Sequence, residues 1–167
     1  MTLAAELSLS IISHESATSG EASVLRVTPG AITCKLADGT GSGKAQLCWS
    51  GSGTIANGGY VDLNLQALTD DRGTLNISSV KAICVKNNAA SASLLFGCTS
   101  AGATPANQWV FSQANTAQAA IDPACCLFRS AAASGMTVSS TSKSIRLASL
   151  SGQASYTLVL VGEGAIS

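Results

Sequence analysis

The chain has 167 residues, of which 46% are hydrophobic but only 4% are aromatic. Charged residues make up 11% of it, against roughly 25% in typical soluble domains, and nine basic residues balance nine acidic ones. These values predict one domain with a core of Ala, Val, Ile and Leu. They argue against the basic patch of a nucleic-acid-binding protein and the polybasic segment of a membrane-surface protein.

The first 30 residues are more polar than the rest, and their first basic residue is Arg26. A secretory leader needs a basic segment before its apolar stretch, so we expect synthesis in the cytoplasm without such a leader. The apolar run at 7–12 is far shorter than the roughly 20 residues that span a bilayer, and no membrane partner is expected. We expect residues 1–30 to form an N-terminal arm or peripheral strands.

Short runs that favour strands, broken by Gly, Asn, Asp and Ser, recur along the whole chain. They predict strands at residues 7–13, 23–28, 32–36, 45–50, 60–65, 74–78, 81–86, 93–97, 108–111, 117–121, 125–129, 144–148 and 155–161. The helical periodicity is weak and confined to "LNLQALTDD" (63–71). Strands spaced by about 8–12 residues predict an all-β fold, a jelly-roll-like antiparallel β-sandwich over residues 31–167.

In two of the predicted strands, successive residues can be assigned clearly to two opposite faces. In "KSIRLAS" (143–149), Ile145 and Leu147 share one face. In "ASYTLVLVG" (154–162), Tyr156, Leu158 and Leu160 share one face, and the opposite face is also largely apolar. A strand that is apolar on both faces is expected at the centre of a covered sheet.

The stretch "ADGTGSGKAQLCW" (37–49) looks at first like a phosphate-binding loop. Such a loop has the pattern G-x-x-x-x-G-K-[ST], but Asp38 occupies the first glycine position and Ala45 lacks the hydroxyl that would hold magnesium. The residues that follow predict a strand, whereas phosphate binding needs a helix N-terminus. We therefore interpret the segment as a flexible protein-contact loop, made by Gly39, Gly41, Gly43 and Lys44.

Catalytic constellations are hard to build from this sequence. His14 is the only histidine and lies in the polar stretch "SHESATSG" (13–20), where exposure to solvent is the simplest interpretation. The adjacent acids Asp70 and Asp71 are expected to point in different directions within a turn, and no calcium-binding spacing follows them. We expect a protein that is not an enzyme, with no catalytic residue, cofactor or metal. A hydrolase would require His14 to lie beside a serine and an acid.

Six cysteines are present: Cys34, Cys48, Cys84, Cys98, Cys125 and Cys126. None forms C-x-x-C, which argues against a zinc site. In a chain made in a reducing cytoplasm they are expected to be free thiols that serve as small apolar core residues, Cys84 in "VKAICVKN" (80–87) above all. Disulfides remain an alternative, although the neighbours Cys125 and Cys126 point to opposite faces of a strand.

The few aromatic residues lie in or beside predicted strands, so most are expected in the core or at subunit interfaces. The cluster "NQWVF" (107–111) is the best candidate for an exposed contact, through Trp109 and Phe111.

The order of the motifs carries a resemblance. The chain contains, in succession, "LADGTGSGKAQLCW" (36–49), "GTIANGGYVDLNLQALTDDRG" (53–73), "ISSVKAICVKNNA" (77–89), "LLFGC" (94–98), "NQWVF" (107–111), "IDPACCLF" (121–128), "SIRLAS" (144–149) and "ASYTLVLVGEG" (154–164). Over about residues 34–164 this succession resembles a family of small structural proteins of tailed bacteriophages and prophages. The chain departs from that family in having "DPACCL" where a Pro-Gly-Gly turn is usual, and in its six cysteines.

The resemblance implies a jelly-roll-like virion component made in the host cytoplasm, most simply a capsid decoration (cement) protein. Its implied partners are the major capsid protein or other virion proteins and copies of itself, as a homotrimer. The alternative is a carbohydrate- or host-binding adhesion module of a phage tail or a cell surface, which would display exposed aromatic residues beside a cleft.

Overall fold

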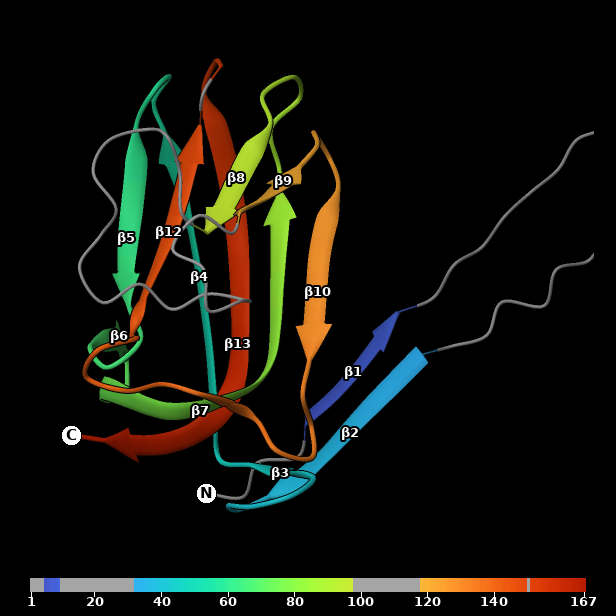
Figure 1. Cartoon of the computed structure of the whole chain (residues 1–167), viewed down its shortest axis with the longest axis vertical. Coiled ribbons are helices and arrows are strands. Elements are labelled where there is room, and N and C mark those ends of the chain that lie inside the picture. Colours follow the sequence, from blue (N-terminus) through green and yellow to red (C-terminus); the bar gives the residue numbers. More distant parts are fainter. Residues whose placement is uncertain (1–4, 10–31, 98–117, 150) are drawn as a thin grey trace, which may run out of the picture.

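A computed structural model of the chain describes residues 5–9, 32–97, 118–149 and 151–167 (Figure 1). Strands and turns make up these residues, and none of them is helical. The predicted all-β antiparallel sandwich is confirmed.

The first of the two main sheets has six strands. Its order is β10 (Cys126–Ser130), β7 (Gly73–Asn87), β13 (Ala154–Ile166) and β4 (Leu47–Ile55), and the short strands β6 (Leu68–Asp70) and β11 (Met136–Thr137) also pair with β7. The second sheet has the order β5 (Tyr60–Asn64), β12 (Ser144–Ser149), β8 (Leu94–Gly97) and β9 (Gln118–Ile121). Every pairing in both sheets is antiparallel.

A third, smaller sheet joins β1 (Ala5–Leu9), β2 (Ile32–Asp38) and β3 (Lys44–Ala45). Strands β1 and β2 form an antiparallel ribbon, whereas β3 pairs with β2 in parallel. In Figure 1 the ribbon runs obliquely away from the sandwich, starting at the end where β3 lies.

Eight strands of the two main sheets pair in a nested order. Strand β4 pairs with β13, β5 with β12, β7 with β10, and β8 with β9. The chain therefore resembles one long hairpin, with β8 and β9 at its tip, folded so that successive pairs lie alternately in the two sheets. Two further pairings close the sheets, β13 with β7 and β12 with β8.

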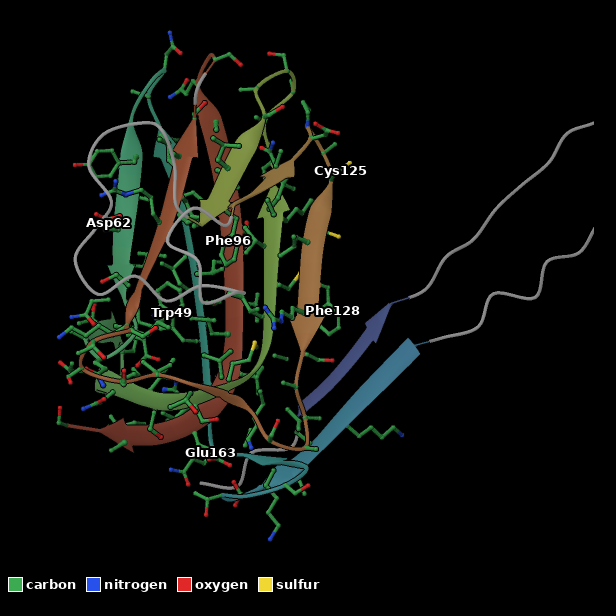
Figure 2. All side chains as sticks on the ribbon, viewed as in Figure 1. Trp49, Asp62, Phe96, Cys125, Phe128 and Glu163 are labelled. Carbon is green, nitrogen blue, oxygen red and sulfur yellow. The ribbon has the colours of Figure 1, made fainter. Side chains whose placement is uncertain are left out.

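The core lies between the facing sides of the two sheets. Strand β13 contributes Leu158 and Leu160, β7 contributes Ile83, and β12 contributes Ile145 and Leu147, all with 0% exposure. Figure 2 shows Phe96 of β8 among the same inward-facing side chains. The faces predicted for residues 144–148 and 155–161 are confirmed, as is the central position of β13 between β7 and β4. The expected cover on both sides of β13 is wrong, because Thr157 and Val159, which point away from the core, are half-exposed.

Strand β7 carries two bulges opposite β13. The pairing skips one residue of β7 between Val161 and Gly162, and another between Glu163 and Gly164. Glycine is required at both positions because the backbones approach closely. A Cβ added to Gly162 would lie 2.3 Å from the carbonyl oxygen of Ser79, and one added to Gly164 would lie 2.0 Å from that of Asn76.

Some predicted elements differ from the structure. The predicted strands at 74–78 and 81–86 are one bent strand, β7, since a bulge bends a strand without ending it. The weak helical pattern at 63–71 instead covers the end of β5, a turn and β6. The predicted strands at 23–28 and 108–111 lie outside the described residues.

Candidate contact surface

The glycine loop is a tight turn between β2 and β3. Gly39, Gly41 and Gly43 have φ values of 113°, 99° and 69°, which are left-handed conformations that favour glycine. The amide of Gly39 donates to the carbonyl oxygen of Ala45 at 3.1 Å, and that of Gly43 donates to Ala132 at 2.9 Å. Strand β3 and then β4 follow the loop, so no helix N-terminus is present to receive a phosphate.

Glu163 on β13 fastens this loop to the sandwich. Its Oε1 atom accepts a hydrogen bond from the amide of Gly41 at 2.5 Å, and the same atom lies 3.1 Å from the Nζ atom of Lys81. The neighbouring Gln46 side chain donates to the carbonyl oxygen of Gly164. The loop predicted to be flexible is therefore held from several sides.

Lys81 is almost completely buried, with a side chain that is 2% exposed against 16% for Glu163. It is the residue of β7 that the pairing skips at the first bulge, and bulges commonly re-aim a side chain. A buried ammonium group is costly unless a carboxylate and hydrogen bonds compensate it. Glu163 thus has two roles, neutralising Lys81 and binding the loop backbone. The sequence analysis did not predict this pair. The glycines on either side of Glu163 could have indicated a bulge or a close backbone approach at this position.

The outward side of the loop is open to solvent. Thr40, Gly41, Ser42 and Lys44 are exposed, and a Cβ added at Gly41 or Gly43 would meet no atom within 4 Å. Beside it lies an open depression of about 320 Å³, lined among others by Thr40, Gln46 and Glu163. Figure 2 shows Glu163 near β3, at one end of the sandwich. The loop therefore offers a polar contact surface whose backbone is already ordered.

A second surface is the side of the first sheet that faces away from the core, here called the outer face. It is defined by Cys48 and Ser50 of β4, Val159 and Val161 of β13, Ala82 and Cys84 of β7, and Phe128 of β10. The register places these residues in rows across the four strands. Small and apolar side chains thus cover this face.

The four cysteines whose side chains the structure describes lie on surfaces rather than in the core. Cys48 and Cys84 are half-buried on the outer face, Cys125 and Cys126 are exposed, and all four are free. The expectation that Cys84 is a core residue is wrong, because its neighbours Ile83 and Val85 fill the core side of β7. Burial raises the pKa of both the Cys48 and the Cys84 thiol, which favours the neutral form. Cys34 and Cys98 are not among the residues whose side chains are described.

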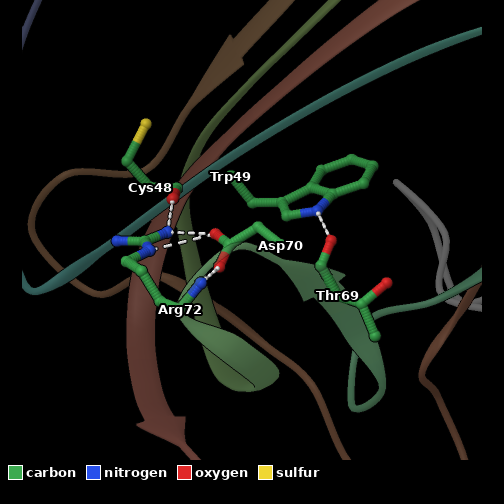
Figure 3. A network of polar contacts seen from close by, with 5 residues as sticks. All are labelled: Cys48, Trp49, Thr69, Asp70 and Arg72. Atoms are coloured by element: carbon green, nitrogen blue, oxygen red, sulfur yellow. Dashed lines mark hydrogen bonds and ion pairs between the residues drawn. The ribbon is translucent and has the colours of Figure 1, made fainter.

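Arg72 fastens the turn between β6 and β7 to β4 (Figure 3). Its guanidinium donates to both the Oδ2 atom of Asp70 and the carbonyl oxygen of Cys48, each at 2.5 Å. The indole of Trp49 donates to the carbonyl oxygen of Thr69 at 3.0 Å. Hydrogen bonds from Arg72 hold the pKa of Asp70 below its ordinary value. Asp70 is therefore a structural partner of Arg72, whereas the adjacent Asp71 is exposed.

A third ion pair lies on the other sheet. Arg146 of β12 is 3% exposed in its side chain and binds both carboxylate oxygens of Asp62 at 2.7 Å. Its guanidinium also lies 3.8 Å from the ring centroid of Tyr60, within the range of a cation–π contact. Asp62 and Tyr60 both belong to β5, so Arg146 joins β12 to its edge neighbour through side chains as well as through the backbone.

Of the residues predicted to make contacts, the structure brings Gly39, Gly41, Gly43 and Lys44 together in one loop. Trp109, Phe111 and His14 lie outside the described residues. Within the described part of the chain, no group of three or more His, Cys, Asp or Glu side chains is arranged to hold a metal ion. The same residues contain no helix long and apolar enough to cross a membrane.

No protein-family model matches the sequence, and no curated protein matches it.

The Lys81–Glu163 pair gives a stability prediction. We expect Glu163→Gln to lower the free energy of unfolding by about 3 kcal/mol, because it leaves the buried ammonium of Lys81 without a charged partner. The double variant K81M/E163Q is expected to be more stable than E163Q alone, since it buries no unpaired charge. Urea unfolding of the four proteins in a double-mutant cycle measures both effects. Additive losses from the two single variants would show that the groups are not coupled.

The lowered pKa of Asp70 gives a pH prediction. Its carboxylate contributes stability that is fully present above the unfolded-state pKa of about 3.9 and is lost as the pH falls through the lower folded-state value. We therefore expect wild type to be more stable than Asp70→Asn at pH 7, and the difference to vanish in strong acid. Urea midpoints across that pH range test this, with Asp71→Asn as the matched control. If D71N changed the stability as much as D70N does, the effect could not be assigned to the hydrogen bonds between Asp70 and Arg72.

Proposed function

We propose that this chain is a structural component of a tailed-phage virion, most simply a capsid decoration protein. It would bind the outer shell of the major capsid protein and copies of itself, as a homotrimer, after synthesis in the host cytoplasm. Its work would be mechanical rather than enzymatic, since contacts repeated over a shell must be broken before the shell can expand or rupture.

The observation that carries this proposal is the ordered glycine loop. Hydrogen bonds to Ala45, Ala132 and Glu163 fix its backbone while its outward side stays open. A loop that is ordered before binding loses little conformational entropy when it contacts a partner. The absence of bulky side chains on Gly41 and Gly43 allows another protein to approach the backbone closely.

The strand order supports a jelly-roll assignment within the sandwich. A jelly roll has eight strands in two sheets, and the nested pairing from β4–β13 inward to β8–β9 is what rolling up one long hairpin produces. Jelly rolls recur in viral capsid proteins and lectins, so the assignment agrees with the virion proposal and also with the alternative one.

The alternative is an adhesion module that binds a carbohydrate or a host surface. The observation that favours it is the exposure of Tyr60, which is 51% accessible to solvent. Among the residues that the structure describes, no other aromatic residue is exposed to this degree. Its ring already lies against Arg146 on one face. A glycan that bound the wild type and not a Tyr60→Ala variant would support this function.

The first test is the copy number of the chain in purified particles from its source. Quantitative mass spectrometry against the major capsid protein is expected to find on the order of hundreds of copies, as repeated shell contacts require. A handful of copies would place the chain in the tail or at a unique vertex. Absence from particles would overturn the virion proposal.

The second test compares two glycines of matched geometry. Gly43 has φ 69° and Gly58, in the turn after β4 at the other end of the sandwich, has φ 70°, and neither position has an atom within 4 Å of an added Cβ. Asn tolerates this conformation, so Gly43→Asn and Gly58→Asn should fold with similar stability. We expect only G43N to weaken binding to stripped capsids, measured by co-sedimentation. Equal binding by both variants would show that the glycine loop does not contact the capsid and only connects β2 to β3.

A further inference from the structure

Strand β4 ends the strand order of the first sheet, and the backbone groups along it alternate in direction. The amide of Asn88 donates to the carbonyl oxygen of Ser155 at 2.8 Å, so Ser155 on β13 turns its backbone toward β7. Directions alternate along a strand, so Tyr156 turns toward β4, where its register partner is Gly53. Gly53 and every second residue from it therefore turn their backbone toward β13.

The residues between them, Ser50, Ser52 and Thr54, turn their amides and carbonyl groups away from β13. Cys48 belongs to the same series, and its carbonyl oxygen is bound by the guanidinium of Arg72 rather than by the sheet. Ser50, Ser52 and Thr54 are exposed, and no backbone group in the described ranges of the chain bonds to theirs. The free edge of β4 thus offers three amides and three carbonyl oxygens, and Arg72 closes it at the Cys48 end.

The other described edges of the two main sheets have features that discourage the addition of a strand. Natural proteins protect edges with charges, with proline or by keeping the edge strand short. Strand β5 carries Asp62, β10 carries Arg129, and β9 has four residues. Strand β4 has nine residues, and its sequence LCWSGSGTI contains neither a charged residue nor proline. Among the described edges, β4 alone lacks this protection.

Small residues on both sides of β4 leave room for a second backbone. On the core side, a Cβ added to Gly51 would lie 2.3 Å from the ring of Trp49, and one added to Gly53 would lie 3.0 Å from the hydroxyl of Tyr156. The opposite side carries only serine and threonine over residues 50–54. Glycine within a strand often marks a place where another backbone approaches closely.

We propose that two copies of this chain pair antiparallel through their β4 edges, with Ser52 of one copy opposite Ser52 of the other. Ser50 of each copy then lies opposite Thr54 of its partner, and each amide on one edge meets a carbonyl oxygen on the other. A second copy is the occupant that the structure favours, because the three outward residues centred on Ser52 are complementary to themselves under a two-fold rotation. Hydroxyl side chains also lie opposite each other at every pair.

This contact goes beyond the proposed function, because it needs no capsid. Two-fold pairing differs from the three-fold contact of the proposed homotrimer, and on a shell it would join one trimer to the next. In solution it doubles the mass of whatever species carries it.

Single cysteines on the edge test the register. The Cα atoms of a hydrogen-bonded antiparallel pair lie about 5.5 Å apart, within the roughly 4.4–6.8 Å that disulfides span. Ser52→Cys should therefore form a covalent dimer when treated with oxidised glutathione, measured on a non-reducing gel with wild type as the background of the native cysteines. Thr54→Cys is the matched control, because residue 54 lies four residues away from its own counterpart. Mixing T54C with Ser50→Cys should restore the cross-link.

Proline on the edge tests the pairing itself. Ser52→Pro removes an amide that points away from β13, which edge strands tolerate, so urea unfolding should show a folded variant. In sedimentation equilibrium the dissociation constant of the mass-doubling step should rise at least about tenfold in S52P and stay unchanged in Ser52→Ala. If S52P does not fold, Ser52→Lys replaces it, because it sets two like charges opposite each other.

Three outcomes would each overturn edge pairing: a wild type without a mass-doubling step, equal effects of S52P and S52A, or equal cross-linking of S52C and T54C. Edge pairing that passes these tests, in a chain absent from particles, would overturn the virion proposal alone. A chain that is abundant in particles but whose S52C variant does not cross-link would overturn edge pairing alone.

Discussion

The ion pair between Lys81 and Glu163 joins three parts of the chain that are distant in sequence. The bulge in β7 buries the ammonium, β13 supplies the carboxylate, and the same carboxylate oxygen binds the amide of Gly41. Each part depends on the others. Without the carboxylate the ammonium is an unpaired buried charge, and without the bulge it faces elsewhere. The order of the glycine loop is thus a consequence of packing inside the first sheet.

Much of the fold follows from local patterns in the sequence. The alternation in β12 correctly placed Ile145 and Leu147 on one face, which is the core face, and the two apolar faces of β13 correctly indicated that this strand is central. The prediction failed where alternation carries no information. Cys84 lies between Ile83 and Val85, and with apolar residues at all three positions a shift of one residue would exchange the two faces unnoticed.

The candidate surfaces were harder to predict, for a physical reason. The glycine loop was visible because its residues are adjacent, but its anchor, Glu163, is brought to it only by the pairing of β13 with β4, the strand that follows the loop. The outer face is similarly composed from four strands that the nested order interleaves. Its small apolar residues resemble core residues in sequence, since both kinds of position exclude charge. Only the pairing register of the strands distinguishes a side chain that fills the core from one that lies on the outer face.

The nested pairing also orders events in time. Strand β13 lies between β4 and β7 and contacts both along most of its length, so the first sheet has no continuous hydrogen-bonded path until β13 has been synthesised. Such long-range pairing makes folding slow, because the entropy cost of closing a long loop is incurred before the stabilising contacts between the strands form. The outer face, which is built on β13, therefore forms only after β13 has been synthesised and has paired with both of its neighbours. A chain in which β13 is still missing carries the outward residues of β4, β7 and β10 but not the surface that they make together.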